Sequence, residues 1–310
     1  MSRKSTSAVD GNYVDQDYSY LVAPAPAAEH AHPQLNPAES AGAVGFGGPD
    51  VSGSDAGPGV GGGGGGARLV TTYTSGNPSV GDANEFNIQI NFSGKWTPQQ
   101  QAVVEWAADF YSQIITADVR DDFDLSGNPV DDIAITISSV PIDGSGGFLA
   151  LTGISAVRDP GSVDQWLPVT ASIFLDSTDL KDHSLSGTWD AIILHEIGHA
   201  LGFVGGLFGV LGLTDGAGHF TGGYAEAAYG GPVPLEDTGG SGTAGSHWDE
   251  ATFAPNGQLM SNELMTGFFV PGETTLLSDT TIGALADLGY HVQDPSVGTS
   301  MIVDSHLLIV

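Results

Sequence analysis

The fold is decided by residues 188–203, TWDAIILHEIGHALGF. Thr188 can cap a helix, and Asp190 suits the positive charge of a first helical turn. Apolar residues run through the segment in a pattern that is compatible with a buried helix. We therefore predict a core helix here, and this helix also carries most of the chemical information in the chain.

Three residues of the predicted helix form a metal-binding pattern, His195, Glu196 and His199. The two imidazoles are four residues apart, so they lie one turn apart on the same face and can reach one metal ion. Glu196 borders that face and can act on a water beside the metal. The alternative is a pair of core histidines that happen to flank a glutamate. The apolar helix and a glycine three residues after the second histidine argue against this alternative.

A catalytic zinc ion needs a third protein ligand and an open position. In the compact string HExxHxxGxxH, the third histidine follows the glycine by three residues. Here Gly202 is in place, but Gly205 occupies the next slot, so the third ligand must come from elsewhere. The candidates are His247, His219 and, less favoured because it follows the last predicted helix, His291.

Upstream of this helix, the apolar pattern predicts strands and one further helix. Residues 86–92, 133–137 and 169–175 alternate apolar and polar side chains, as half-buried strands do. Thr97 and Gln100 form a capping box with a proline between them, which predicts a helix that ends near residue 117. The order strand, helix, strand, strand predicts an α/β or α+β domain.

The composition excludes several classes of protein. The chain has 310 residues, 7 Lys and Arg against 37 Asp and Glu, a net charge of -30 and no cysteine. The lack of cysteine excludes a disulfide scaffold, an iron–sulfur cluster and a thiol nucleophile. So acidic a surface repels nucleic-acid phosphates, and we expect no nucleic-acid partner. No stretch approaches the roughly 20 apolar residues that span a bilayer, so we also expect no membrane anchor.

Both ends of the chain differ in composition from its middle. Residues 1–66 are rich in Ala, Pro, Gly and Ser and end in six glycines, so we expect a disordered leader or propeptide. Acidic residues stand where a secretory signal would have its apolar region. Residues 294–310 form a tail that ends in MIVDSHLLIV. This run resembles the C-terminal export signals of type I secretion; the alternative is a buried strand.

Residues 122–128, DFDLSGN, resemble the start of a calcium loop, with oxygen ligands at alternate positions and a glycine at the turn. Ile133 stands where an EF-hand needs a bidentate glutamate, which disfavours an EF-hand. A solvated acidic turn is the simpler interpretation. Calcium is therefore a further candidate cofactor, without an assigned site.

Three more motifs follow downstream: SHW at 246–248, ELMTG at 263–267 and GALADLGY at 283–290. Together with HEIGHALGF at 195–203 and the long insertion after it, they resemble the leishmanolysin-type metallopeptidases, particularly the bacterial members. The similarity covers roughly residues 86–292 and departs from the protozoan pattern in having no cysteines. The last motif also predicts a helix that begins at Ser278 or Asp279 and ends at Gly289.

The resemblance implies roles for five residues. His195, His199 and His247 would be zinc ligands, Glu196 the catalytic base, and Met265 the methionine of a Met-turn beneath the metal. The implied fold is α+β, a zincin-like metzincin domain with a twisted mixed sheet, an active-site helix and a mostly irregular C-terminal subdomain.

The same resemblance implies how the chain is divided. An N-terminal catalytic subdomain would span residues 67–202, and a C-terminal subdomain with the third ligand and the Met-turn would span 203–293. The strand at residues 169–176 would be the sheet edge to which a substrate adds as an extra strand. The leader is a candidate for blocking the cleft until it is removed; without a cysteine, it cannot do so through a thiolate on zinc.

The resemblance finally implies a zinc endopeptidase that hydrolyses peptide bonds of extracellular proteins. The alternative is a non-catalytic extracellular module, metal-binding or adhesive, that keeps a zincin fold. High Gly and Asp content and few Lys suit a secreted bacterial protein without a cleaved N-terminal Sec signal. Its expected partners are protein or peptide substrates, with the type I secretion machinery as a further candidate.

Overall fold

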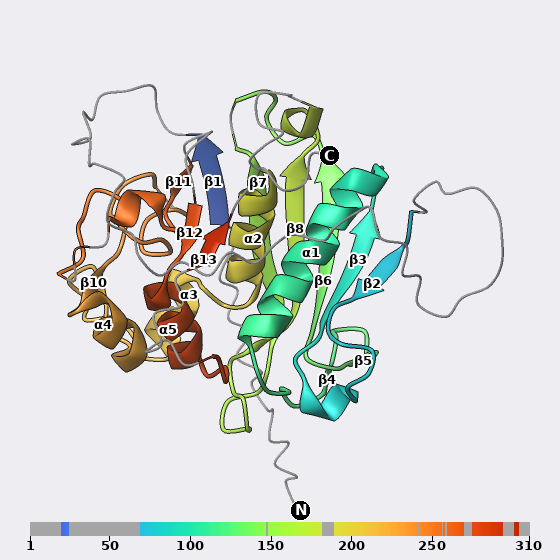
Figure 1. Cartoon of the computed structure of the whole chain (residues 1–310), viewed down its shortest axis with the longest axis horizontal. Helices are drawn as coiled ribbons and strands as arrows, with labels where there is room; N and C mark the ends of the chain where they lie inside the picture. Colours follow the sequence, from blue (N-terminus) through green and yellow to red (C-terminus); the bar gives the residue numbers. More distant parts are fainter. Residues whose placement is uncertain are drawn as a thin grey trace, which may run out of the picture.

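A seven-stranded mixed sheet forms the centre of the molecule, in the order β11, β1, β7, β8, β6, β3, β2 (Figure 1). The computed structural model describes residues 20–24, 69–146, 148–181, 189–240, 242–255, 257, 259–269, 275–293 and 301–303. The strands of the sheet are β1 Tyr20–Pro24, β2 Thr72–Thr74, β3 Ile88–Ser93, β6 Ile133–Val140, β7 Ala150–Val157, β8 Pro168–Asp176 and β11 Phe268–Phe269.

Two helices lie side by side on one face of the sheet, α1 at Pro98–Ile114 and α2 at Trp189–Ala200 (Figure 1). Helix α1 contacts β3, whereas α2 contacts β7 and β8. Every residue of α2 is buried, as predicted. The capping box of α1 is present, with the Gln100 N–H donating to Thr97 Oγ1 (3.2 Å) and the Thr97 N–H to Gln100 Oε1 (2.9 Å).

The three segments with alternating apolar residues form the predicted strands. β3, β6 and β8 are neighbours and run parallel. Their apolar positions are in register, since Ile90 lies opposite Ile135 and Ile135 opposite Ala171. All three side chains are buried, so these strands present one continuous apolar face to the helices.

β7 is a strand that the sequence pattern did not reveal. Its residues, ALTGISAV, include a glycine and several small side chains, and the pairing with β8 shifts between Ile154 and Ala156. A bulge of this kind breaks the period of two by which strands are recognised. β7 runs antiparallel to β8, which pairs with β6 on its other side. The prediction that residues 169–176 form the sheet edge is therefore wrong, because β8 is paired on both sides.

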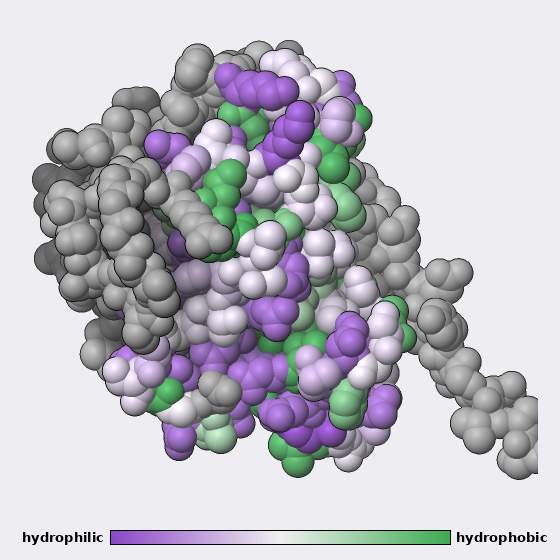
Figure 2. All heavy atoms as spheres, turned by 90° about the vertical axis from the view of Figure 1, so that its right-hand side faces the viewer, coloured by the Kyte–Doolittle hydropathy of each residue, from purple (hydrophilic) through white to green (hydrophobic). Residues whose placement is uncertain are grey.

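The two ends of the sheet differ in what covers them. At one end, β1 from the leader lies between β7 and β11. Neither β1 nor β11 was predicted from the sequence. At the other end, β2 exposes Thr72 and Thr74, and the described residues on this side of the molecule mix hydrophilic and hydrophobic types (Figure 2). Residues 20–24 form a strand, so the prediction that residues 1–66 are disordered does not hold for them. The other residues of 1–66 lie outside the described part of the chain, and their disorder stays a prediction.

The C-terminal half consists of short elements joined by irregular chain, as expected for this fold class. Its last helix, α5 (Asp279–Leu288), has the predicted N-cap Ser278 and C-cap Gly289. The tail contributes β13 (Met301–Val303), which pairs antiparallel with β12 (Thr275–Leu277), and residues 304–310 lie outside the described residues. The division of the chain into four parts stays a prediction. The elements are α3 Gly205–Val210, β9 His219–Phe220, α4 Gly223–Tyr229, β10 Val233–Pro234, β12 Thr275–Leu277, α5 Asp279–Leu288 and β13 Met301–Val303.

Residues 122–128 form a hairpin turn between β4 Asp122–Phe123 and β5 Pro129–Val130. Asp124 Oδ1 accepts the N–H groups of Ser126 and Asn128, both at 2.8 Å. Its Oδ2 accepts from the Asn128 side-chain amide, also at 2.8 Å. Both carboxylate oxygens are thus engaged within the turn, which is the geometry of the simple acidic turn.

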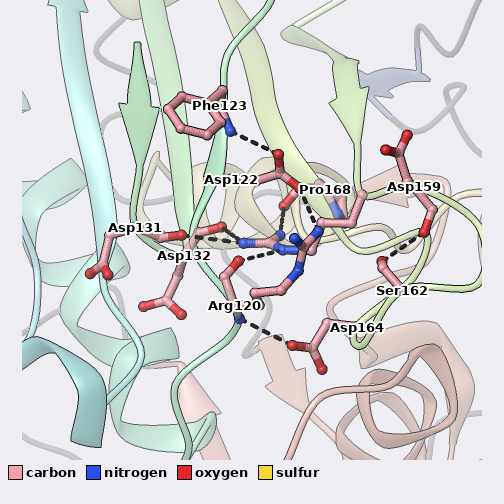
Figure 3. A network of polar contacts seen from close by, with 10 residues as sticks. Arg120, Asp122, Phe123, Asp131, Asp132, Asp159, Ser162, Asp164 and Pro168 are labelled. Atoms are coloured by element: carbon pink, nitrogen blue, oxygen red, sulfur yellow. Dashed lines mark hydrogen bonds and ion pairs between the residues drawn. The ribbon is translucent and has the colours of Figure 1, made fainter. Parts of the chain in front are cut away.

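A buried arginine joins four segments at the ends of the central strands. Arg158, which follows β7, is 1% exposed. Its guanidinium donates to the carbonyl oxygens of Arg120 (2.8 Å), Pro168 (2.8 Å) and Asp132 (2.7 Å), which appear in Figure 3. The chain segments before β4, before β6 and at the start of β8 are therefore held by one side chain.

One described stretch, Trp189–Val210, is long and apolar enough to cross a membrane by length and composition alone. This differs from the expectation that no such stretch exists. The stretch comprises α2, a turn at Gly202 and α3, and 89% of its most apolar window is buried inside the protein. Core helices pass the same test, so the stretch is weak support for a membrane span.

Candidate active site

Helix α2 carries His195, Glu196 and His199 into the interior of the molecule. Because α2 packs on β7 and β8 and against α1, all three side chains are enclosed, with exposures of 4%, 0% and 0%. The Nε2 atoms of the two histidines lie 2.9 Å apart. The helical spacing thus brings the two ring nitrogens together, as predicted.

His247 supplies a third imidazole from the far end of the insertion. Its Nε2 atom lies 3.2 Å from that of His195 and 3.0 Å from that of His199, and the ring is fully buried. The other two candidates lie elsewhere. His219 pairs with Asp215 (Nδ1 to Oδ2, 2.8 Å) with 40% of its side chain exposed, and His291 is exposed.

Two glycines explain why the third histidine comes from so far along the chain. Gly202 has a φ of 105°, a left-handed conformation that ends the helix. Gly205 lies against the segment that leads to His247: a Cβ on Gly205 would stand 2.5 Å from the Gly245 carbonyl oxygen. The Gly205 N–H also donates to Ser246 Oγ (3.1 Å). Close backbone packing therefore fills the place of the third histidine in the compact string.

The outer nitrogens of the three rings fix their protonation. Nδ1 of His195 lies 2.6 Å from the Leu264 carbonyl oxygen, and Nδ1 of His199 lies 2.6 Å from that of Phe203. Nδ1 of His247 lies 2.9 Å from the carbonyl oxygen of Thr243. A carbonyl oxygen only accepts hydrogen bonds, so we assign the ring proton to Nδ1 in each case. The three Nε2 atoms then turn their lone pairs toward one another.

Such an arrangement suits a metal ion. Three lone pairs about 3 Å apart, with no proton between them, repel one another unless a cation lies among them. Burial lowers the pKa of His195 to about 3 and that of His247 to about 4, and it lowers the pKa of His199 well below its ordinary value. All three rings are therefore neutral at pH 7, which is the form that binds zinc. Backbone carbonyls on the outer nitrogens are the usual partners of zinc-binding histidines.

Glu196 lies beside these rings in an unusual environment for a carboxyl group. It is 0% exposed, and Thr152 of β7 donates a short hydrogen bond to its Oε2. Its Oε1 has no hydrogen-bond partner among the described residues. Burial raises the pKa of Glu196 to about 8, against the lowering effect of the Thr152 hydroxyl. One carboxylate oxygen is therefore held while the other is free to exchange a proton with a ligand.

Met265 lies directly under α2, where a Met-turn was expected. Its side chain is 0% exposed, and its Sδ lies 2.7 Å from the place of a Cβ on Gly198. The Met265 carbonyl oxygen accepts the N–H of Trp248, the residue after His247 (2.9 Å). The turn thus contacts both the helix that bears two histidines and the segment that bears the third.

Glu263 is a buried residue of this site that was not predicted. It is 2% exposed. Its Oε2 accepts the Met265 N–H (2.5 Å), and its Oε1 accepts the hydroxyls of Ser278 (2.8 Å) and Thr281 (2.5 Å). The carboxylate fastens the turn that bears Met265 to the start of α5 and so fixes Leu264, whose carbonyl oxygen orients His195. Its only sign in the sequence was its position inside the ELMTG motif.

Comparison with known proteins supports a single family. The family profile described as Leishmanolysin (Peptidase_M8) matches residues 126–306, which include the three histidines, Glu196 and Met265. A search of curated proteins finds no match.

Proposed function

Because the chain belongs to the leishmanolysin family of metallopeptidases, we propose that it is a zinc-dependent endopeptidase. The observation that supports this best is the convergence of three Nε2 atoms from His195, His199 and His247 within 2.9–3.2 Å. Beside them lies a buried glutamate with one oxygen unpartnered among the described residues. Three neutral imidazoles can supply the protein ligands of a catalytic zinc site, and a carboxylate beside them can serve as its general base.

Each residue has a defined task in this proposal. His195, His199 and His247 hold zinc through Nε2, and their Nδ1–H groups stay on backbone carbonyls, which fixes the ring orientations. Zinc, when bound, supplies a Lewis acid that polarises the scissile carbonyl and makes water easier to deprotonate. Met265 fills the space beneath the site and keeps water out of it.

Glu196 moves the proton. Its Oε1 takes a proton from the attacking water and delivers it to the amine that leaves. Thr152 keeps Oε2 in a hydrogen bond, so the carboxyl group presents Oε1 throughout. Burial favours the protonated carboxyl, which helps the second transfer, whereas a nearby dication favours the carboxylate that the first transfer needs.

The substrate in this proposal is an extended peptide that pairs with β7 rather than with β8. β7 borders the site because its Thr152 touches Glu196. Its side away from β8 pairs with β1 from the leader, so a peptide would have to take the place of β1, whereas both neighbours of β8 belong to the central sheet of the domain. Pairing through the backbone tolerates many sequences and leaves preference to side-chain pockets.

A digestion assay tests the base. With an unfolded protein such as casein, we expect hydrolysis that a zinc chelator abolishes and added zinc restores. Glu196→Gln keeps the three histidines and the hydrogen bond from Thr152, so it should retain zinc but lose about 10³-fold in kcat. Wild-type turnover in this variant would refute Glu196 as the base.

The proposal extends to where the enzyme works. We expect a bacterial protein that is secreted without a cleaved Sec signal, through its C-terminal residues and type I machinery. Residues 301–303 pair with β12, so deletion should be confined to 304–310 and secretion compared with that of the full chain. Undiminished export would refute the signal. Calcium binding also stays a prediction, to be read from metal analysis of the purified protein.

The competing proposal is a non-catalytic extracellular module that keeps the fold. The three histidines and the Glu196 Oε1, which has no partner in the described part of the chain, favour the enzyme, because a binding module has no use for a base beside its metal. Zinc-loaded protein that never cleaves an unfolded substrate would favour the module.

A further inference from the structure

A polar cavity lies on the face of the sheet that is opposite α1 and α2. The buried isoleucines of β3 and β6 point toward the helices, so the residues that alternate with them point to the other face. There the hairpin of β4 and β5 and the strands of the sheet together line a cavity of about 470 Å³. This volume lies within the range of about 300–1,000 Å³ that small-molecule sites occupy.

The floor of the cavity consists of two rows of side chains that cross three parallel strands. In one row, Asn91 of β3 lies opposite Thr136 of β6, which lies opposite Ser172 of β8. In the next row, Gln89 and Thr170 stand on either side of an alanine. Neighbouring strands are about 4.8 Å apart, so hydroxyl and amide groups follow one another at this spacing across the floor.

The polar groups of the floor are available to a ligand. Of the residues that the structure describes, none forms a hydrogen bond with the hydroxyls of Thr136, Thr170 and Ser172. The Gln89 amide donates to Asn91 Oδ1 (3.1 Å), which leaves Gln89 Oε1 as an acceptor and the Asn91 amide group as a donor. The floor therefore presents donors and acceptors side by side.

The bulge in β7 adds one more hydroxyl to the cavity. The pairing with β8 passes from Ile154 opposite Ala171 to Ala156 opposite Thr170, so Ser155 is the extra residue. Ser155 is exposed and lines the cavity. Bulges re-aim side chains, and this bulge turns the Ser155 hydroxyl into the same space as the floor.

The charge of the lining limits what can bind. The described residues that line the cavity include no Lys, Arg or His, and the chain has a net charge of -30. An anionic ligand would therefore find no partner and would be repelled. Asp124 is the one charged residue of this lining, but Ser126 and Asn128 already donate to its two oxygens. The lining thus favours a neutral ligand.

The backbone of the sheet is not available on this face. β6 pairs with β3 on one side and with β8 on the other, so the N–H and C=O groups of β6 are engaged within the sheet. An extended peptide that binds through its backbone needs a free sheet edge instead. A ligand in the cavity must be recognised by side-chain hydroxyls and amides, which both donate and accept hydrogen bonds.

We propose that this cavity binds a neutral oligosaccharide. Sugar hydroxyls donate and accept hydrogen bonds, and so do the Ser, Thr, Asn and Gln side chains of the lining. Phe174 stands on the same face in the row beyond Ser172 and is 40% exposed. Its ring can pack against the apolar C–H face of a sugar unit that extends from the cavity.

The site lies across the sheet from α2, and its binding function does not depend on the proposed peptidase function. A bound glycan leaves Glu196 and the three histidines untouched, because they are on the helix side of the sheet (Figure 1). The cavity would hold the protein on glycosylated material while the other face acts on peptides.

Isothermal titration calorimetry of the full chain tests the proposal with neutral trisaccharides: maltotriose, cellotriose, mannotriose and triacetylchitotriose. At least one of them should bind, whereas the acidic trisaccharide trigalacturonate should not, because the lining has no cation to receive its carboxylates. An uncharged glycine–serine peptide of similar length should not bind either.

Variants of the floor locate the binding. Thr136→Val together with Ser172→Ala removes two hydroxyls and keeps the backbone pairing, so the affinity for the trisaccharide should fall about tenfold or more. Thr178→Val together with Ser79→Ala is the matched control, because both residues are exposed and lie outside the cavity. The control should bind as the wild type does. Phe174→Ala should weaken binding about threefold or more.

Several results would overturn the inference: no binding of any neutral trisaccharide, equal binding of trigalacturonate, or equal affinity in the floor variant and its control. Binding of the glycine–serine peptide as tightly as the sugar would also overturn it, in favour of a site for polar peptides. Sugar binding by a chain that never cleaves casein would leave this inference standing while the peptidase function fails.

Discussion

Thr152 shows how one hydroxyl can hold the carboxyl group that we propose as the base. It is fully buried on β7 and donates to Glu196 Oε2, while Oε1 has no described partner. A hydrogen bond to the charged form lowers the pKa of a carboxyl, so this contact opposes the rise that burial causes. The geometry gives Thr152 a positioning role with a measurable pH signature.

Thr152→Val should impair catalysis without unfolding the site. Valine has nearly the same shape but no donor, so the pKa of Glu196 should rise and the acid limb of kcat/KM should move to higher pH. We expect kcat to fall about tenfold, and KM to change little. Thr152→Ser, which keeps the hydroxyl, is the control. An unchanged pH profile in the valine variant would show that the hydroxyl does not act on the base.

The sequence was most informative for residues that share a motif. The spacing of His195 and His199 on one helix predicted their meeting, and the SHW and ELMTG motifs located His247 and Met265 through the family resemblance. Thr152 and Glu263 were missed because their partners lie at least 15 residues away in the chain, apart from the Met265 N–H that Glu263 also binds. A hydrogen bond between distant segments leaves no periodic pattern to read.

At the scale of elements too, the features that depend on neighbouring residues were predicted, and those that depend on distant segments were not. Helices α1 and α5 follow from their caps, since Thr97 and Ser278 bind N–H groups within their own first turns. Strands β3, β6 and β8 follow from alternation. β7 has a glycine and a bulge, which interrupt its alternation. The order of strands across the sheet also differs from their order along the chain, so it could not be predicted from the sequence. β8 was therefore mistaken for the edge.

Asp176, at the end of β8, holds the loop that leads into β7. Its buried carboxylate accepts the N–H groups of Ile142 (3.0 Å), Asp143 (3.0 Å) and Thr178 (2.6 Å). Burial alone would raise the pKa of Asp176, but these hydrogen bonds outweigh it and lower the pKa to about 2. A pKa below the unfolded value means stabilisation that is present above about pH 4 and lost as the pH falls toward 2.

Asp176→Asn should therefore lower the free energy of unfolding by about 2 kcal/mol at pH 7, because the new amide donor faces existing donors. The difference from wild type should shrink as the pH falls from 4 toward 2. Urea denaturation across this range measures it, with the exposed Asp159→Asn as control. A gap that is independent of pH would contradict the role assigned to the Asp176 charge.

For the whole molecule, Arg158 shows how the domain is held together at the end of β7. Its buried guanidinium satisfies carbonyl oxygens from three other segments (Figure 3). Burial lowers its pKa, but an arginine stays charged at every pH at which the protein folds. One charged side chain thus donates hydrogen bonds to several buried carbonyl oxygens that would otherwise each need a separate donor.

Arg158→Met should destabilise the fold by about 3 kcal/mol, because it leaves buried carbonyl oxygens without donors. Arg120→Met is the matched control. The side chain of Arg120 is 44% exposed and pairs with Asp122 at the surface, so its loss should cost less than about 1 kcal/mol. Thermal or urea unfolding compares the two. Equal effects would show that the buried arginine has no special part in stability.

The central claim is that one zinc ion is held by two histidines of α2 and one from beyond the insertion. The most direct measurement is the zinc content of the purified wild-type chain, of His247→Ala and of His219→Ala, by elemental analysis. We predict one zinc per chain for the wild type and for His219→Ala, and less than about a tenth of that for His247→Ala. Full zinc content in His247→Ala, with loss in His219→Ala, would contradict the account.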